Sequence, residues 1–352
     1  MWSMKKVAII GHFGGNETFC DGQTVKTKNL EGLLEDCSDI SIKRVDTYYS
    51  RSNKFRLLWD TIKAMATCKY VFLLVSTNGM RVYLPLLYYL NKVFRKHIFH
   101  YIIGSELLAM VEQDKGLVKY LNALDANWFE YKSGTEFLQK NGVNNVVTVP
   151  NFKNITPIDE VTAYSCEKQS YSFCTFSRVM KEKGITDAIK AIVRVNKEFG
   201  SKIATLDVYG PIDVSYQEEF DRLLATHSDC VEYKGLVDSQ QSVEVLKDYY
   251  ALLFPTHWAG EGMPGTIIDA FAAGLPIIAS DWNANKEFVE NQKHGLIYPS
   301  DEAQTLYDAI GWSLKNTDRI NRMRYDCRAE FTKYMPETVL EIIRKAMDES
   351  QK

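Results

Sequence analysis

The stretch Gly260–Asp281, GEGMPGTIIDAFAAGLPIIASD, contains four glycines, two prolines and three acids, around one short apolar helical pattern, and two of the acids, Glu261 and Asp269, lie eight positions apart. The apolar run ALLFP lies just upstream, so the order is a buried strand, a long loop and a helix. Pro264 suits the first helical turn, where its missing N–H costs nothing. Gly274 can end the helix, and Pro276 begins the next strand.

The same alternation of apolar runs and helical periods extends outward in both directions. Strands of this kind, buried on both sides and separated by helices, predict parallel sheets covered on both faces. We expect strands at 7–10, 40–45, 71–75, 98–103, 128–131, 146–149, 171–177, 205–209, 231–233, 251–254, 276–280 and 296–298. We expect helices at 23–35, 54–66, 83–94, 107–124, 135–140, 186–198, 216–226, 242–249 and 302–314.

The pattern breaks at 151–170, a stretch with two prolines and no clear period. The prediction is therefore an α/β protein of two Rossmann-like, doubly wound domains that face a cleft. Residues 1–155 form the N-terminal domain and residues 156–335 the C-terminal domain. A last helix over 336–352 follows, with a return to the first domain as one option. A length of 352 residues agrees, because single cores stop growing at about 250–300 residues.

Composition narrows the function classes. The net charge of −3, from 42 basic and 45 acidic residues, gives no indication of a nucleic-acid partner. The seven cysteines form no C-x-x-C pair, which favours a reducing cytosol over a disulfide framework or a zinc site. No segment approaches 18 apolar residues in a row, so no membrane span is expected. P-loop, nucleophile-elbow, zincin and D-x-D patterns are absent, and we expect neither a metal nor another cofactor.

The acids of the opening stretch are the first candidate site residues. A carboxylate at Glu261, held between glycines just before a helix, can accept hydrogen bonds from sugar hydroxyls. Asp269 lies on an otherwise apolar helix, so the two acids can contact different parts of an extended ligand. Gly262 and Gly265 let backbone N–H groups approach that ligand closely. The alternative is that both acids are solvated surface groups.

Two further segments place charge or glycine where a strand gives way to a helix. In FSRVMKEKGITDAIKAI, Arg178 ends a strand and Lys183 leads into a helix, a placement that suits a diphosphate. In the first loop, Gly14, Gly15 and Gly22 separate strand from helix without the spacing of a dinucleotide fingerprint. Surface solvation and an ordinary mobile loop are the simpler alternatives.

Taken in order, FSRVMKEKG, VYGP, VEYKGLV and EGMPGTIIDAFAAGLPIIASD resemble the donor half of retaining nucleotide-sugar glycosyltransferases of family four, group 1 glycosyl transferases with the GT-B fold. KKVAIIGHFGG and GVNNVVTVPNF agree more loosely. The resemblance implies a retaining, metal-independent hexosyltransferase acting from a UDP- or GDP-sugar on a glycan or lipid-linked acceptor. The implied setting is cell-surface polysaccharide or glycoconjugate biosynthesis. Alternatives on the same plan are a nucleotide-sugar epimerase and a non-catalytic nucleotide-sugar-binding subunit.

The resemblance also implies roles for single residues. Arg178 and Lys183 match the basic pair that holds the donor diphosphate, and Glu261 matches the first Glu of the E-x7-E motif, which contacts the sugar. Asp269 stands where a second Glu usually binds the ribose, and it is one methylene shorter. Front-face departure and attack would need no protein nucleophile. The remaining donor-side candidates are Gly15, Gly22, Gly262, Met263, Pro264 and Gly265.

On the acceptor side the chain departs from the family pattern. Many members carry a His directly before the position of Gly104, where this chain has Ile103. His100 lies three residues earlier, and a structural strand histidine is its simpler interpretation. Ser105 and Glu106 complete the acceptor-side candidates.

The segment Met80–Lys96, MRVYLPLLYYLNKVFRK, is apolar and aromatic with basic residues at its edges. It fits a core helix whose basic last turn matches the helix dipole. It also fits a helix lying on an anionic membrane, next to a lipid-linked acceptor. The residues favour the core helix slightly, whereas the family resemblance favours the membrane. We expect a cytoplasmic protein, with peripheral contact at the inner face of the membrane as the second option.

Overall fold

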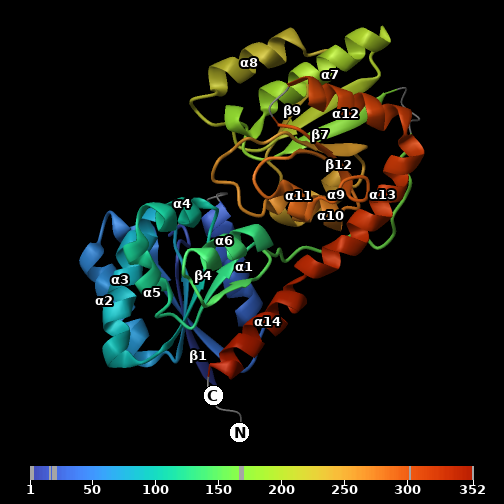
Figure 1. The fold of residues 1–352 in the computed structure, drawn as a ribbon. Coiled ribbons are helices and arrows are strands. Elements are labelled where there is room, and N and C mark those ends of the chain that lie inside the picture. Colours follow the sequence, from blue (N-terminus) through green and yellow to red (C-terminus); the bar gives the residue numbers. More distant parts are fainter. Residues whose placement is uncertain (1–3, 16, 18–21, 166–169, 301–302, 351–352) are drawn as a thin grey trace. The chain divides into compact units, whose positions relative to one another are not determined.

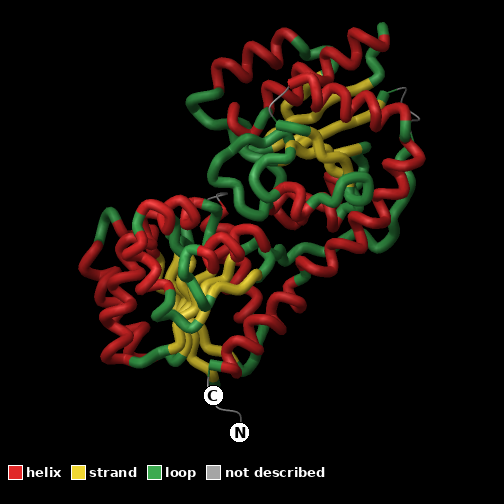
Figure 2. The backbone as a smooth tube through the Cα atoms, viewed as in Figure 1, coloured by secondary structure: helices red, strands yellow, loops and turns green. Residues whose placement is uncertain are grey.

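The chain divides into two compact units in a computed structural model that describes residues 4–15, 17, 22–165, 170–300 and 303–350 (Figure 1). The first unit contains Met1–Asn154 and Tyr334–Lys352, and the second contains Ile155–Lys333. In each unit, helices cover a six-stranded sheet (Figure 2). Every strand pair in both sheets is parallel, and the two Rossmann-like domains expected from the sequence are confirmed.

The sheet of the first unit has the strand order β2-β1-β3-β4-β5-β6. Its strands are β1 (Lys5–Gly11), β2 (Ile40–Asp46), β3 (Tyr70–Leu74), β4 (His97–Tyr101), β5 (Ala126–Phe129) and β6 (Val146–Thr148). Its helices are α1 (Gly22–Glu35), α2 (Lys54–Thr67), α3 (Thr77–Phe94), α4 (Glu106–Gln113), α5 (Val118–Leu121), α6 (Lys132–Lys140) and α14 (Pro336–Glu349).

The core of the first unit is built on β3, whose five residues YVFLL are all buried. Stacked aromatic rings extend it across the sheet, with Phe99 and Trp128 centroids 5.2 Å apart. Helix α14 packs its buried Val339, Ile343 and Met347 into the same cluster. An ion pair anchors this helix: Arg344 Nη2 donates to Asp39 Oδ1 at 2.7 Å and lowers the pKa of that carboxyl.

The sheet of the second unit has the order β9-β8-β7-β10-β11-β12. Its strands are β7 (Tyr171–Phe176), β8 (Ala204–Tyr209), β9 (Val231–Gly235), β10 (Ala251–Phe254), β11 (Ile277–Ser280) and β12 (Gly295–Tyr298). Its helices are α7 (Ile185–Phe199), α8 (Gln217–Thr226), α9 (Ser242–Leu246), α10 (Gly265–Ala272), α11 (Asn285–Phe288), α12 (Ala303–Lys315) and α13 (Thr317–Glu330).

Several helical segments differ from the sequence prediction, and two of the differences are large. The single helix expected over 107–124 is broken into α4, a 3-10 turn at Lys115–Leu117 and α5. Asp114 makes the break, because its extended backbone ends α4 and its Oδ1 accepts from Gly116 N at 2.8 Å. Helix α13 has no counterpart among the predicted elements. It buries Ile320, Met323 and Cys327 at spacings of three and four residues.

Candidate functional site

The strand order of the second sheet reverses between β7 and β10. Strand β7 pairs with β8 on one side and with β10 on the other. After β7 the chain continues to β8 and β9 on one side of the sheet, and after β10 it continues to β11 and β12 on the other side. In open α/β sheets, ligands bind outside the carboxyl ends of the strands at such a reversal. The loop after β7 carries Arg178 and Lys183, and the loop after β10 carries Glu261. The candidate site is therefore assembled from these two loops.

An ion pair joins the two loops. Lys183 Nζ donates to Glu261 Oε2 at 2.5 Å, and the two side chains are 15% and 8% exposed. Thr256, completely buried at the end of β10, donates its hydroxyl to the same oxygen at 2.8 Å. Both of these hydrogen bonds go to Oε2, which leaves Oε1 of Glu261 without a hydrogen-bond partner among the described residues. The carboxylate is thus fixed in orientation and retains the ability to accept further bonds.

Gly184 explains how the loops come so close. Its φ of +72° is in the left-handed region, and a Cβ there would lie 2.1 Å from the carbonyl oxygen of Pro255. Only glycine lets the backbone after Lys183 pass that closely over the end of β10. A backbone bond from His257 N to Glu182 O, 2.8 Å long, fastens the same contact.

The loop after β10 is also held by the last residue of β11 and by two residues that follow that strand. Ser280 Oγ donates to Thr256 O at 2.6 Å, and Asn283 Nδ2 donates to Ala259 O at 3.2 Å. Trp282 Nε1 adds a 2.8 Å bond to the carbonyl of Trp258. The loop that holds Glu261 is therefore supported along its length, which limits how far the carboxylate can move.

Helix α10 begins directly after this loop and has no side-chain cap. Pro264 is its N-cap residue and makes no side-chain hydrogen bond to the first-turn N–H groups. The hydroxyl of Thr266, in the first turn, is buried and lacks a hydrogen-bond partner among the described residues. Uncapped N–H groups and a positive helix end are a site for an anion. Gly262 and Gly265 are half-buried here, and Met263 is buried between them.

Asp269 lies one turn further along α10 and is only 1% exposed. Its Oδ1 accepts from the hydroxyl of Ser242, the completely buried first residue of α9, at 2.8 Å. The shorter acid is thus used to fix α9 against α10. The ribose contact assigned to it from the family pattern stays a prediction.

Arg178 is exposed at the end of β7, and among the described residues no hydrogen bond or ion pair joins it to Lys183 or Glu261. Its charge acts on Asp213, whose pKa is lowered chiefly by hydrogen bonds from Ser215 and less by the Arg178 charge. The guanidinium is therefore at the rim of the site. The predicted basic pair consists of one held side chain, Lys183, and one exposed side chain.

The glycines of the first unit are placed by β2. Asp46, at the end of that strand, accepts from Gly15 N at 2.9 Å through Oδ2 and from Phe13 N at 2.9 Å through Oδ1. Gly15 has φ +57°, and a Cβ there would lie 2.7 Å from the ring of Tyr48. Gly22 is the exposed first residue of α1. Residues 16 and 18–21, between these glycines, lie outside the described part of the chain.

The acceptor-side candidates differ in exposure. His100 is completely buried on β4, where its Nδ1 lies 3.1 Å from Asn127 Oδ1. Burial lowers the pKa of His100 to about 4, so the ring is neutral at neutral pH. Ser105 is the N-cap residue of α4, and Glu106 is the exposed first residue of that helix. Only Ser105 and Glu106 are at a carboxyl end of the first sheet where a ligand could reach them.

Two features of these edges were absent from the sequence prediction. Thr256, which holds Glu261, directly follows Pro255, the first residue after β10, and this position is the only signal of its role in the local sequence. In the first unit, Lys26 of α1 pairs with Glu130 at 2.6 Å, with side chains 3% and 7% exposed. The two residues are 104 positions apart, and their local sequences contain no signal of the pairing.

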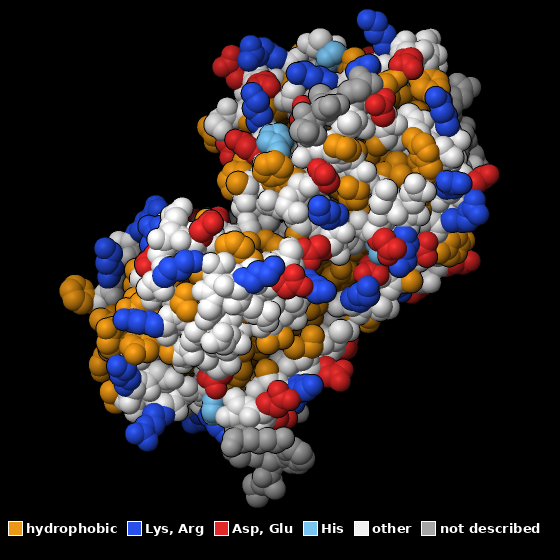
Figure 3. All heavy atoms as spheres, in the orientation of Figure 1, with side chains coloured by type: hydrophobic (Ala, Val, Ile, Leu, Met, Phe, Trp, Pro, Cys, Tyr) orange, Lys and Arg blue, Asp and Glu red, His pale blue; other side chains and the backbone are white. Residues whose placement is uncertain are grey.

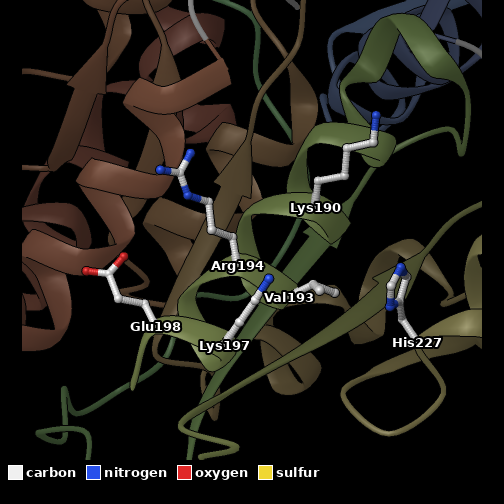
Figure 4. A pocket seen from close by; sticks show the side chains of 6 residues that line it. All are labelled: Lys190, Val193, Arg194, Lys197, Glu198 and His227. Carbon is white, nitrogen blue, oxygen red and sulfur yellow. The ribbon is translucent and has the colours of Figure 1, made fainter. Parts of the chain in front are cut away.

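A shallow hollow of about 600 Å³ lies elsewhere on the second unit (Figure 4). Figure 4 shows Arg194 turned away from His227, and its guanidinium lies over the Tyr307 ring at 4.2 Å. None of the predicted site residues lines this hollow, and it is separate from the Lys183–Glu261 pair. It is lined by Lys190, Val193, Arg194, Lys197, Glu198 and His227.

The second unit is similar in sequence to known proteins. Residues 170–316 match the family of glycosyl transferases group 1. The GtfA subunit of the UDP-N-acetylglucosamine–peptide N-acetylglucosaminyltransferase of Streptococcus pneumoniae is 27% identical over 213 residues, which are 58% of this chain and 40% of that protein. The amylovoran biosynthesis glycosyltransferase AmsK of Erwinia amylovora is 25% identical over 142 residues, 39% of this chain and 34% of that protein. This chain thus spans less than half the length of these two relatives.

A solved structure extends the likeness to the whole fold. The crystal structure of HepE from Anabaena in complex with UDP superposes with a TM-score of 0.73 at 14% identity, covering 98% of this chain and 100% of that chain. Together with the two parallel sheets, this defines the GT-B fold. Within that fold, residues 170–316 match the glycosyl transferases group 1, which confirms the group 1 glycosyltransferase resemblance inferred from the sequence.

No three His, Cys, Asp or Glu side chains in the described part of the chain are grouped so that they could hold a metal ion. Among the described helices, none combines the length and the apolar character that crossing a bilayer requires.

Proposed function

We propose that this protein is a retaining glycosyltransferase that transfers a sugar from a UDP-sugar. The observation that carries the proposal is the ion pair of Lys183 and Glu261, which joins the loops after β7 and β10 where the strand order reverses. The match of residues 170–316 to the glycosyl transferases group 1 and the likeness to UDP-bound HepE support it.

Hydrogen-bonding capacity suggests how the donor lies. A lysine ammonium has three donors, and Lys183 uses one of them on Glu261. The other two can bind the diphosphate, next to the uncapped start of α10 and the unpartnered Thr266 hydroxyl. Glu261 Oε1 can accept from a hydroxyl of the sugar. The donor would then extend from the helix end toward Glu261, with its phosphates on the Lys183 side.

The chemistry that these residues support is charge neutralisation. As the bond between the sugar and the diphosphate breaks, negative charge develops on the leaving oxygen, and Lys183 and the end of α10 stabilise it. Departure and attack on the same face of the sugar would retain the anomeric configuration without a protein nucleophile. The role of Glu261 is to hold the sugar and to orient Lys183. Metal-independence is part of this proposal.

For the acceptor we propose a glycan or a lipid-linked glycan in cell-surface polysaccharide or glycoconjugate biosynthesis, as the family resemblance implies and as the similarity to AmsK supports. A peptide acceptor is the second candidate, because the Streptococcus pneumoniae relative is a subunit of a peptide N-acetylglucosaminyltransferase. Incubation with UDP-N-acetylglucosamine and either a serine-rich peptide or a lipid extract separates the two. Label transferred to the peptide would favour the second candidate.

A thermal-shift panel tests the donor assignment. We expect UDP-sugars to raise the melting temperature and GDP-sugars to have a smaller effect, and no shift with any nucleotide sugar would overturn the proposal. Product analysis without acceptor distinguishes the alternatives. Slow release of free sugar supports a transferase, an epimerised nucleotide sugar indicates an epimerase, and binding without turnover on any acceptor indicates a binding subunit.

A further inference from the structure

Helix α2 has two apolar faces, and only one of them is packed. Thr61, Ala64 and Met65 face the core of the first unit. Phe55, Leu58 and Trp59 are 88%, 41% and 66% exposed. Their spacing of three and four residues places these three side chains on one stripe of the helix. A single amphipathic helix needs only one apolar face, so the second face requires an explanation.

Helix α3 repeats the arrangement. Its buried residues are Met80, Tyr83, Leu84 and Leu87. Val82, Tyr89 and Val93 are 60%, 56% and 75% exposed. Their separations of seven and four residues again define one stripe, on the side of the helix away from the buried residues. The segment Met80–Lys96, which the sequence predicts as either a core helix or a helix on a membrane surface, therefore has one buried apolar face and one exposed apolar face.

The two stripes belong to neighbouring helices. The hydroxyls of Thr61 in α2 and Tyr83 in α3 lie 3.4 Å apart. Arg56 of α2 lies over the Tyr49 ring at 5.7 Å, in the 3-10 turn Thr47–Ser50 that precedes the helix. That contact places the charged side of α2 toward the turn. In Figure 3, hydrophobic side chains gather over α2 and α3 at the left edge of the first unit, with Lys and Arg around them.

We call the six exposed residues Phe55, Leu58, Trp59, Val82, Tyr89 and Val93 the α2–α3 surface. Positive charge surrounds it. Residues 54–67 and 77–96 contain seven Lys or Arg residues and a single acid, Asp60, in a chain whose net charge is −3. Next to the surface, Lys92 lies over the Tyr88 ring at 4.6 Å and Lys119 over the Tyr120 ring at 4.7 Å. Aromatic rings combined with lysines are typical of side chains that lie at the headgroup level of a bilayer.

We propose that the α2–α3 surface docks on an anionic lipid bilayer, with Phe55, Trp59 and Val93 entering the boundary between headgroups and acyl chains. Apolar exposure alone would fit a protein partner equally well. The excess of cations and the lysine–aromatic pairs together favour the bilayer, because acidic headgroups attract each Lys or Arg near the surface and aromatic rings lie at the headgroup level. The apolar stripes then supply the anchoring that charge alone lacks.

Docking would keep the first unit at the membrane, where a lipid-linked acceptor is found. That consequence rests on the proposed function, but the docking itself does not. Donor binding is assigned to the second unit and is measured with soluble nucleotides. A failure of vesicle binding would therefore leave the donor assignment intact, and a failure of donor binding would leave the docking intact.

Co-sedimentation of the full chain with vesicles tests the proposal. We expect binding to vesicles of phosphatidylglycerol and phosphatidylcholine, weaker binding to phosphatidylcholine alone, and a loss of binding as salt is added. The double variant Phe55→Ser/Trp59→Ser should bind about tenfold more weakly or less. Phe199→Ser/Tyr325→Ser, which changes two exposed rings of the second unit (40% and 56% exposed), is the matched control and should bind like the wild type.

Fluorescence and self-association complete the test. Emission of the wild type should shift to the blue on adding the anionic vesicles, and Trp59→Phe should lose that change. The proposal is overturned if the wild type does not bind anionic vesicles, or if Phe55→Ser/Trp59→Ser binds as well as the control. It is also overturned if the same double variant abolishes a dimer in the absence of lipid and the wild type ignores vesicles, because the occupant is then a second copy.

Discussion

Each unit contains a lysine–glutamate pair at the carboxyl ends of its parallel strands, and the two pairs differ in what surrounds them. Lys26 donates to Glu130 at 2.6 Å and to Ile102 O at 2.7 Å, and its Nζ lies 3.7 Å from the centre of the Tyr101 ring. The side chains of that pair are 3% and 7% exposed. The Lys183–Glu261 pair is equally short but more accessible, with side chains 15% and 8% exposed.

The difference separates a structural pair from a ligand-binding one. Desolvation lowers the pKa of Lys26, and three neighbours surround its ammonium, so the pair mainly connects α1 to β4 and β5. Lys183 keeps two donors, and Glu261 keeps one oxygen without a partner among the described residues. Although both pairs consist of a lysine and a glutamate, we expect breaking the first to lower stability and breaking the second to lower activity.

The largest effect should follow from breaking the buried Lys26–Glu130 pair. Glu130→Ala leaves Lys26 buried and unpaired, and breaking a buried pair in this way costs about 3–5 kcal/mol of unfolding free energy. Lys26→Met/Glu130→Leu removes both charges and should recover most of that loss. Urea denaturation of the three proteins measures this. A single variant as stable as the wild type would show that the pair is not a structural connection.

Lys183→Ala should affect activity more than stability. We expect a large loss of activity and a smaller loss of unfolding free energy than in Glu130→Ala. Removing one preorganised group that stabilises developing charge lowers turnover by about 10²–10³-fold. Donor hydrolysis measures the loss, and Glu261→Ala should match it. The matched control is Lys190→Ala, an exposed lysine on α7 outside the candidate site. Full activity in Lys183→Ala would refute the assignment of the Lys183–Glu261 pair to donor binding.

Acid should lower the free energy of unfolding through His100 on β4, because burial lowers the pKa of this histidine to about 4. Because 6.5 is the ordinary value, the unfolded chain binds more protons than the folded chain between pH 6.5 and 4. The stability contributed by neutral His100 is thus complete above pH 6.5 and is lost as the pH falls toward 4, by up to about 3 kcal/mol. Urea titrations at several pH values should show a shallower fall for His100→Asn. An identical pH dependence in wild type and variant would contradict this.

The smallest expected effect concerns Asp269, which Ser242 holds at 2.8 Å. If the acid also binds the ribose, Asp269→Asn should reduce the preference for UDP over 2′-deoxy-UDP by about fivefold, the worth of one net hydrogen bond. Calorimetric titration with both nucleotides gives the ratio. An unchanged ratio would restrict Asp269 to fixing α9.

Most strands of this fold could be predicted because they are short, apolar and buried, as YVFLL in β3 illustrates. Helix α13 could not. Arg324 interrupts its buried stripe, and the guanidinium is satisfied by carbonyls distant in sequence, with Nη1 donating to Tyr249 O at 2.9 Å and Nη2 to Lys247 O at 2.6 Å. In a hydrophobicity pattern, an arginine indicates an exposed position even where the folded chain buries it. The break at Asp114 was missed because a side-chain bond to Gly116 competes with an otherwise continuous helical period.

The same reasoning applies to the candidate site. Lys183, Glu261 and the start of α10 were found because glycine and proline mark the turns that place them. Thr256 and the Lys26–Glu130 pair were missed, since both depend on contacts between distant strands. Sequence patterns indicate where a chain turns, whereas the partners of a buried polar group depend on the complete sheet.

Calorimetric titration of UDP into the wild type and into Lys183→Ala tests the central claim most directly. The account predicts a single site in the wild type and affinity reduced by about ten- to a hundredfold in the variant, the worth of a hydrogen bond to a charged group. Equal affinity in the two proteins, or no UDP binding by the wild type, would contradict the assignment of the Lys183–Glu261 pair as the donor site.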